Sequence, residues 1–255
     1  MKGTKLKKFS YHFGLLLLAV VSFQIGTMSF AQQNQTLNQQ AAGRLTYLAG
    51  LCDELNKKGS NRIINIICIG NSVPAGFTKA PLVDPFSAYP YLLHRGLKQK
   101  YPYAIINVIV SAKGGETSDK GLARYAKDVL LFAPDLITID YGLTDRFLGL
   151  DKSRINLKLM IGLAKDFGIK VLLLTPTPDL KVNMDNPNDP LNQHAEQIRN
   201  VAEELKVGLV DSYAMFKLYV QKGGKIEGLL SNNRNHPNLN GHEIVAKEIL
   251  KWFPR

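Results

Sequence analysis

The stretch IICIGNSVPAG, residues 66–76, decides the expected fold and directs the search for a function. An apolar run stops at Gly70, and Asn71 and Ser72 follow at once in a loop that contains proline and glycine. Short runs that are apolar on both faces are typical of strands in a parallel sheet that helices cover on both sides. The stretch therefore predicts a buried strand whose end presents a serine.

Apolar runs of the same kind alternate with amphipathic stretches along the rest of the chain. The expected strands are Ile63–Ile69, Ala104–Ser111, Asp135–Tyr141, Lys170–Thr175 and Val207–Asp211. The expected helices are Ser87–Lys100, Thr117–Phe132, Asp151–Phe167, Leu191–Leu205 and Gly241–Trp252. This alternation predicts an α/β fold of three layers, α/β/α, with a doubly wound sheet of about five parallel strands.

Ligands of such folds bind beyond the carboxyl ends of the strands, so the loops after the strands are the places to look for chemistry. The first four strands are followed by GNS (70–72), KGGETS (113–118), YGLTDR (141–146) and TPTPD (175–179). The last helix is preceded by SNNRNHPNLNGH (231–242). Most of these loops carry groups that are suited to acyl transfer.

Ser72 is the candidate nucleophile, and a serine hydroxyl stays weak until a base within hydrogen-bond reach takes its proton. Among the five histidines of the chain, His236 is the expected base. The proline that follows it fixes its loop and keeps it out of the final helix. His242 is interpreted as a helix-start residue, and a helix-capping role for His236 stays open.

The negative oxygen that develops in acyl transfer requires donors that are already in place. The backbone N–H of Gly115 can face a ligand because no side chain blocks the approach, and the N–H of Ser72 can do the same. Alternatively, the GGETS segment is a plain turn before a helix that Thr117 or Ser118 caps.

Taken together, the segments GNSV, GGETS, GLTD and NHPNLNGH resemble, in order and at the strand ends, the SGNH (GDSL) hydrolase family. The resemblance runs from about residue 63 to the C-terminus and is strongest to a bacterial exported subgroup. It implies a flavodoxin-like sheet, with Ser72 as nucleophile and His236 as base. It also implies an oxyanion hole made by the N–H groups of Ser72 and Gly115 and by a side chain of the third block, here Thr144.

The chain departs from that family's pattern at three positions: Asn71, Thr144 and Asn233. The family has aspartate, asparagine and aspartate there. An asparagine oxygen can orient an imidazole but cannot balance its positive charge, so Asn233 is the expected but weaker partner of His236. The alternative carboxylates follow the fourth strand: Asp179, Asp185 and Asp189.

Residues 1–31 have the layout of a cleavable secretory signal, with lysines, then a short apolar stretch, then small residues before Gln32. Residues 32–255 are expected to form a single domain, and the protein is expected to be secreted or periplasmic. A retained membrane anchor is the alternative; after cleavage no membrane association is expected. Loss of the four signal lysines lowers the formal charge from +11 to +7.

The remaining lysines are scattered and do not form a block, so no nucleic-acid partner is expected. Two cysteines, Cys52 and Cys68, lie in apolar surroundings and leave a disulfide open, although packing as small hydrophobic groups is favoured. The pair His236 and His242 has no further histidine or cysteine close by in the sequence, so neither a metal nor another cofactor is expected.

The loop residues predict acyl transfer by a serine. The resemblance, together with the expected export, implies a serine esterase that removes a small acyl group from a carbohydrate, with a small-molecule or carbohydrate ester as its substrate. An acyltransferase would use the same groups and differ only in the acceptor. A binding protein of the same fold that turns over slowly or not at all is the alternative from another class, because three family positions are changed. Retention of Ser72, Gly115 and His236 favours the enzyme.

Overall fold

The computed structural model describes residues 43, 44 and 46–254, and a compact unit begins at Arg44. The predicted signal at residues 1–31 lies outside the described residues, so both the signal and the start of the domain at residue 32 stay predictions. In the described part of the chain, no helix has the length and apolar character needed to span a membrane.

Five parallel strands form the sheet in the order β2-β1-β3-β4-β5. They are β1 (Ile63–Gly70), β2 (Ile105–Ala112), β3 (Leu136–Asp140), β4 (Lys170–Leu174) and β5 (Gly208–Val210). This order is the flavodoxin-like one, in which the chain reverses direction across the sheet next to β1. Gly70 pairs with Ala112 on one side and with Asp140 on the other, so the loops after β1, β2 and β3 leave the sheet side by side. The predicted fold class is confirmed.

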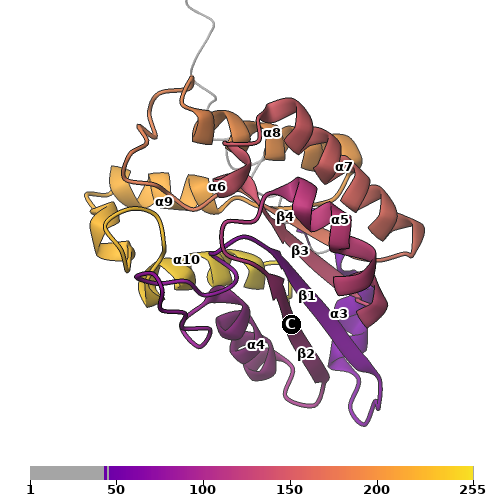
Figure 1. Cartoon of the computed structure of the whole chain (residues 1–255). Coiled ribbons are helices and arrows are strands. Elements are labelled where there is room, and N and C mark those ends of the chain that lie inside the picture. The colour runs from indigo at the N-terminus through magenta and orange to yellow at the C-terminus, as the bar shows by residue number, and fades with distance from the viewer. Residues whose placement is uncertain (1–42, 45, 255) are drawn as a thin grey trace, which may run out of the picture. The chain divides into compact units, whose positions relative to one another are not determined.

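Helices cover both faces of the sheet (Figure 1). One face packs against α3 (Ala49–Asn56), α4 (Tyr89–Lys100), α9 (Ser212–Gln221) and α10 (Leu239–Leu250). The other packs against α5 (Ser118–Asp128), α7 (Leu150–Asp166) and most of α8 (Pro190–Leu205). Shorter elements are α6 (Gly142–Asp145) and the 3₁₀ helices η1 (Leu130–Phe132) and η2 (Ile226–Leu229).

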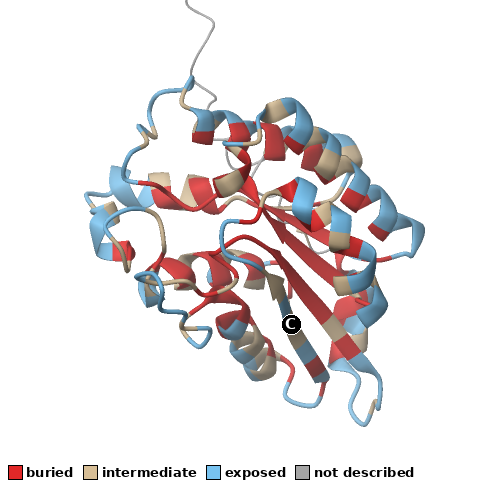
Figure 2. Cartoon of the chain, viewed as in Figure 1, coloured by how far each residue is buried: buried red, intermediate tan, exposed pale blue. Residues whose placement is uncertain are grey.

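Strand β1 shows why a continuous apolar run belongs in the centre of such a sheet. Ile64, Ile66 and Cys68 join the core cluster on one face, and Ile67 and Ile69 join the cluster on the other. Successive side chains of a strand point to opposite faces, so both sets must be apolar when both faces are covered. Figure 2 shows the central strands buried along most of their length.

The structure shortens one expected helix and adds others, among them α6 and α9. The expected helix over 117–132 ends at Asp128 and continues as η1. Helix α9 was not expected; it begins directly after β5, where the carboxylate of Asp211 accepts a hydrogen bond from Ala214 N at 3.2 Å and caps the helix. Both Cys52 and Cys68 are buried free thiols, so the open disulfide is not formed.

Candidate active site

The turn after β1 presents Ser72 at the carboxyl edge of the sheet. A Cβ atom at Gly70 would lie 2.4 Å from the backbone oxygen of Asp140, so only glycine allows the two strands to approach this closely. The side-chain oxygen of Asn71 then accepts from Val73 N at 2.9 Å and closes a tight turn around Ser72. Because Asn71 is fully buried, its amide shapes the turn and stays out of the pocket.

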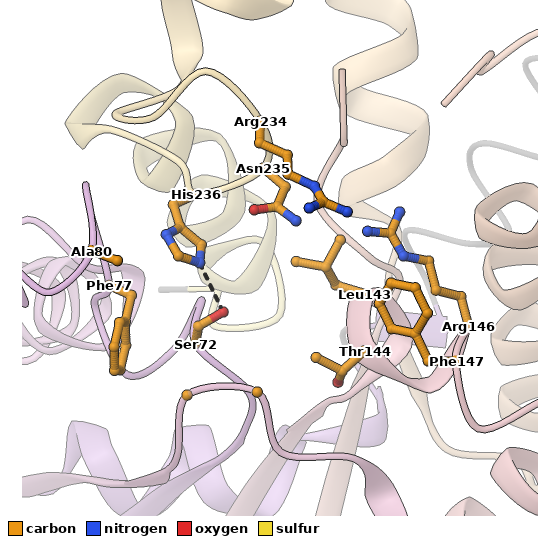
Figure 3. Close-up of a pocket in the computed structure, with 12 residues that line it drawn as sticks. Ser72, Phe77, Ala80, Leu143, Thr144, Arg146, Phe147, Arg234, Asn235 and His236 are labelled. Atoms are coloured by element: carbon orange, nitrogen blue, oxygen red, sulfur yellow. Dashed lines mark hydrogen bonds between the residues drawn. The ribbon is translucent and has the colours of Figure 1, made fainter. Parts of the chain in front are cut away.

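His236 lies opposite Ser72 and is oriented for proton transfer (Figure 3). The Nε2 atom of His236 is 3.2 Å from Ser72 Oγ, and its Nδ1 atom is 2.6 Å from the backbone oxygen of Thr78. A carbonyl oxygen only accepts, so Nδ1 must carry the proton and donate it to Thr78. This leaves Nε2 of the neutral ring free to accept the Ser72 hydroxyl proton.

The loop before α10 holds His236 through its backbone. The side-chain oxygen of Asn232 accepts from the N–H groups of Arg234, Asn235 and His236, at 3.2, 2.8 and 2.9 Å. Ser231 N donates to the backbone oxygen of His236 at 2.8 Å. One half-buried amide side chain thus fixes three consecutive peptide groups and, with them, the position of His236.

Among the described residues, no carboxylate or amide side chain makes a hydrogen bond with the imidazole. Asn233 is exposed and makes no hydrogen bond with His236, which contradicts its expected role as the ring's partner. Asp189 caps α8 by accepting from Leu191 N, and Asp185 pairs with a lysine on the surface. Asp179 pairs with Arg146, a residue of another wall of the pocket. The Thr78 carbonyl occupies the place that an acid was expected to fill.

Two residues that line the pocket, Ser72 and Gly115, have backbone N–H groups without a partner in the described part of the chain. Gly115 has φ +71°, a backbone conformation that residues other than glycine rarely adopt. No neighbouring atom lies within 4 Å of the place where its Cβ would be. Gly115 N and Ser72 N donate to no described residue. The adjacent Glu116 anchors the loop, since its carboxylate accepts from Arg124 Nε and from the hydroxyl of Tyr141, each at 2.8 Å.

Thr144 lines the pocket, but its hydroxyl is used elsewhere. Its oxygen is 2.7 Å from the backbone oxygen of Glu116 and 3.1 Å from that of Tyr141, so its one proton is donated away from the pocket. It also accepts weakly from the Asn71 amide at 3.4 Å. Figure 3 shows the hydroxyl turned away from Ser72. This geometry contradicts the expected role of Thr144 as an oxyanion donor.

Asp145, the last residue of the GLTD block, connects the loop after β3 to the loop after β2. It is fully buried, and its carboxylate accepts from Ser118 N at 2.8 Å and from Ser153 Oγ at 2.7 Å. The first bond caps the N-terminus of α5, directly after the Gly115 loop. Asp145 therefore ties the third loop to the second and does not face the pocket.

His242 is a structural residue, as expected. Its Nδ1 accepts from Tyr89 N at 3.2 Å, and the ring is buried in the helix layer. Burial, with a smaller contribution from the charge of His236, lowers the pKa of His242 to about 3, so the ring is neutral. It does not line the pocket.

The pocket has a volume of about 490 Å³. Several of the residues that line it were not predicted from the sequence. The missed residues are Phe77, Ala80, Leu143, Arg146, Phe147, Arg234 and Asn235. Arg146 directly follows the GLTD block, and Arg234 directly precedes the NHPN block. This position next to a recognised block is the signal that could have found the two arginines. Within the described residues, no group of three or more histidine, cysteine, aspartate or glutamate side chains is arranged to hold a metal.

Comparison with known proteins places this geometry among ester hydrolases. The sequence model of the GDSL-like Lipase/Acylhydrolase family matches residues 68–244. An acetylxylan esterase of Geobacillus stearothermophilus is 25% identical over 167 residues, which cover 61% of this chain and 75% of that protein. Catalytic mutants of the Geobacillus enzyme Axe2 replace a serine, an aspartate or a histidine, with the aspartate three residues before the histidine.

The solved structures agree on the fold. The crystal structure of Axe2 aligns with a TM-score of 0.65 at 23% identity and covers 78% of this chain and 96% of that one. LAE5, an alpha/beta hydrolase enzyme from the metagenome of Lake Arreo, Spain, aligns with a TM-score of 0.63 at 22% identity and covers 78% of this chain and 97% of that one. At these identities, the likeness shows a common fold.

Proposed function

The chain belongs to the GDSL-like lipase/acylhydrolase family and is a carboxylic ester hydrolase, and from this premise we propose that it removes a small acyl group from a carbohydrate by Ser72–His236 catalysis. The observation that carries the proposal is the chain of contacts from Ser72 Oγ to His236 Nε2, at 3.2 Å, and from His236 Nδ1 to Thr78 O, at 2.6 Å. It gives the hydroxyl a neutral acceptor of fixed orientation.

In the proposed reaction, Ser72 Oγ attacks the carbonyl carbon of the ester as its proton moves to His236 Nε2. The tetrahedral intermediate collapses, the carbon–oxygen bond to the sugar breaks, and His236 returns the proton to the departing sugar oxygen. Water then gives a proton to Nε2 and attacks the acyl carbon. The bond from this carbon to Ser72 Oγ breaks, Nε2 returns the proton to Oγ, and the acid is released. The atoms and charges balance without a cofactor.

The negative oxygen of the intermediate would be stabilised by the N–H groups of Ser72 and Gly115. Both groups are without a partner in the described part of the chain. Removal of one such donor typically costs about 10² to 10³ in turnover, so a site with two donors is weaker than a site with three. Asn71 and Thr144 support this geometry through the turn and the loop and do not bind the oxyanion themselves.

The imidazolium that forms during the reaction faces a carbonyl dipole and not a carboxylate. The dipole keeps the correct ring nitrogen protonated, which is a large part of what the triad acid does, since loss of the correct tautomer costs about 10⁴. The dipole supplies only part of the electrostatic stabilisation that a full negative charge would give. We therefore expect an active enzyme of moderate turnover.

The carbohydrate part of the proposal is supported by the relative, an acetylxylan esterase. We propose acetate as the acyl group, since the pocket of about 490 Å³ is bounded near Ser72 by Phe77 and Leu143 and offers polar groups for a sugar on its far wall. Action outside the cytoplasm is a further proposal, and the pattern of residues 1–31 supports it.

The proposal is tested by hydrolysis of 4-nitrophenyl acetate and by acetate release from acetylated xylan. Wild type should hydrolyse the aryl ester, and Ser72→Ala should lose this activity. Ser60→Ala is the matched control, because Ser60 does not line the pocket and precedes β1 at the opposite end of the strand from Ser72. Equal hydrolysis by Ser72→Ala and wild type would refute the assignment of the nucleophile.

A further inference from the structure

The wall of the pocket beyond His236 is strongly basic. Arg146 and Arg234 both line it, and none of the described residues that line the pocket carries a carboxylate. Figure 3 shows the two guanidinium groups directed toward one another across this wall. Like charges are brought together at a cost in free energy, so an arrangement of this kind calls for a compensating anion.

Asp179 supplies one compensating charge, and it serves both arginines. Its carboxylate pairs with Arg146, and the same oxygen lies 3.5 Å from Arg234 Nε and 3.2 Å from the Asn235 amide nitrogen. The other oxygen accepts from Lys181 N at 2.9 Å. Burial alone would raise the pKa of Asp179, but the hydrogen bond and charge of Arg146 lower it overall, so the group is ionised.

One positive charge remains without a counter-ion at this wall. The described ion pairs of Arg146 and Arg234 contain a single carboxylate, that of Asp179, against two guanidinium groups. The nearby ring of His194 adds no charge, because burial and then the charge of Arg146 lower its pKa to about 4. Both arginines line the pocket, and within the described residues the excess charge has no further carboxylate partner.

Arg146 also keeps donors free. Its side chain is only 8% exposed, and its hydrogen bond to Asp179 uses one terminal nitrogen. Its buried Nε has no partner among the described residues, and its second terminal nitrogen donates to none of them either. A guanidinium that is buried, stacked over the ring of Phe147 and not saturated by the described residues is placed to bind a planar anion.

We propose that Arg146 and Arg234 form a subsite for a carboxylate of the substrate, so that the ester cleaved at Ser72 belongs to an acidic, uronate-containing glycan. This inference rests on the proposed function, because it names the class of glycan that the same pocket accepts. Arginine is matched to carboxylates through two parallel N–H donors, and the amide of Asn235 completes a polar edge beside them. A neutral xylan lacks the group that this subsite binds.

The test compares two soluble substrates that differ only in charge: an O-acetylated oligogalacturonate and its carboxamide counterpart. Acetate release is measured at low salt. Wild type should prefer the acid by about tenfold in kcat/KM, which corresponds to one charge-assisted hydrogen-bonded pair. The preference should shrink as salt rises, because the subsite opens to solvent at Arg234, which is 48% exposed.

The key variant is Arg234→Gln, since Arg234 is half exposed and its loss leaves the Arg146–Asp179 pair in place. The acid-to-amide ratio should fall severalfold, mainly through KM. Arg95→Gln is the matched control: Arg95 is an exposed arginine of α4 that does not line the pocket, so the same charge is removed elsewhere and the ratio should be unchanged.

The outcomes separate the two proposals. Equal cleavage of the acid and the amide by wild type, with normal hydrolysis of 4-nitrophenyl acetate, overturns the carboxylate subsite and leaves the esterase standing. An equal fall of the ratio in Arg234→Gln and Arg95→Gln overturns the assignment to Arg234. Failure of wild type to hydrolyse any of the three esters overturns the proposed function, and the subsite with it.

Discussion

Replacement of Thr144 by valine distinguishes a loop anchor from an oxyanion donor. Valine keeps the shape of the side chain and removes the hydroxyl that donates to the Glu116 oxygen at 2.7 Å. Glu116 is only 6% exposed, so its carbonyl loses a buried partner, which costs about 1–3 kcal/mol of stability. For a chain of this size, 2 kcal/mol corresponds to a fall in Tm of about 4–8 °C.

Turnover should change much less than stability in this variant. The Gly115 loop stays anchored, because the Glu116 carboxylate keeps its bonds to Arg124 and Tyr141. We expect kcat for 4-nitrophenyl acetate to fall less than about fivefold, against the 10²–10³ that loss of an oxyanion donor typically costs. Thermal unfolding and steady-state kinetics on one preparation check both numbers. A loss of kcat of about 10² or more with unchanged KM and Tm would show that Thr144 binds the oxyanion.

Two further changes probe the imidazole and the helix layer. Asn233→Asp should change kcat on 4-nitrophenyl acetate less than about fivefold, because an exposed carboxylate is screened by solvent and Thr78 already holds His236 Nδ1. A gain of about 10² in kcat would show that residue 233 reaches the ring. His242 has a folded-state pKa of about 3, against about 6.5 when unfolded, so its contribution to stability is complete above pH 6.5 and is lost as pH falls toward 3. His242→Asn keeps an acceptor for Tyr89 N. The free energy of unfolding, measured by urea titration, should therefore rise less steeply with pH between these values, by about 1.4 kcal/mol per pH unit. An unchanged slope against pH would contradict a buried neutral ring.

The sheet could be predicted from the sequence because each strand carries its own signal. In runs such as 63–69, all residues except Asn65 are apolar, so both faces of the strand carry apolar side chains, as a covered parallel strand requires. Helix α9 lacked such a signal, since its cap Asp211 was read as the end of the preceding strand. Local patterns thus identify elements well, while their limits depend on hydrogen bonds that only the folded chain makes.

Of the candidate site, Ser72 and Gly115 could be placed together because they follow β1 and β2 at one edge of the sheet. His236 lies in the loop before α10 and could be placed beside them only through the resemblance to the SGNH family. The partner of the imidazole could not be found, because it is a backbone oxygen, that of Thr78, and every residue has one. Nor could the direction of the Thr144 hydroxyl be inferred, since it depends on an acceptor 28 positions earlier in the chain. Sequence reveals which side chains are present; tertiary contacts decide which of their atoms are free.

Covalent labelling by a fluorophosphonate probe tests the central claim most directly, because the probe reacts with a serine that a neighbouring base has activated. Peptide mapping by mass spectrometry should locate the adduct on Ser72. Labelling should be lost in Ser72→Ala and strongly slowed in His236→Ala, and it should be unchanged in His94→Ala, whose histidine lies on α4 and does not line the pocket. An adduct on another residue, or equal labelling rates in wild type and His236→Ala, would contradict a nucleophile activated by the Ser72–His236–Thr78 contacts.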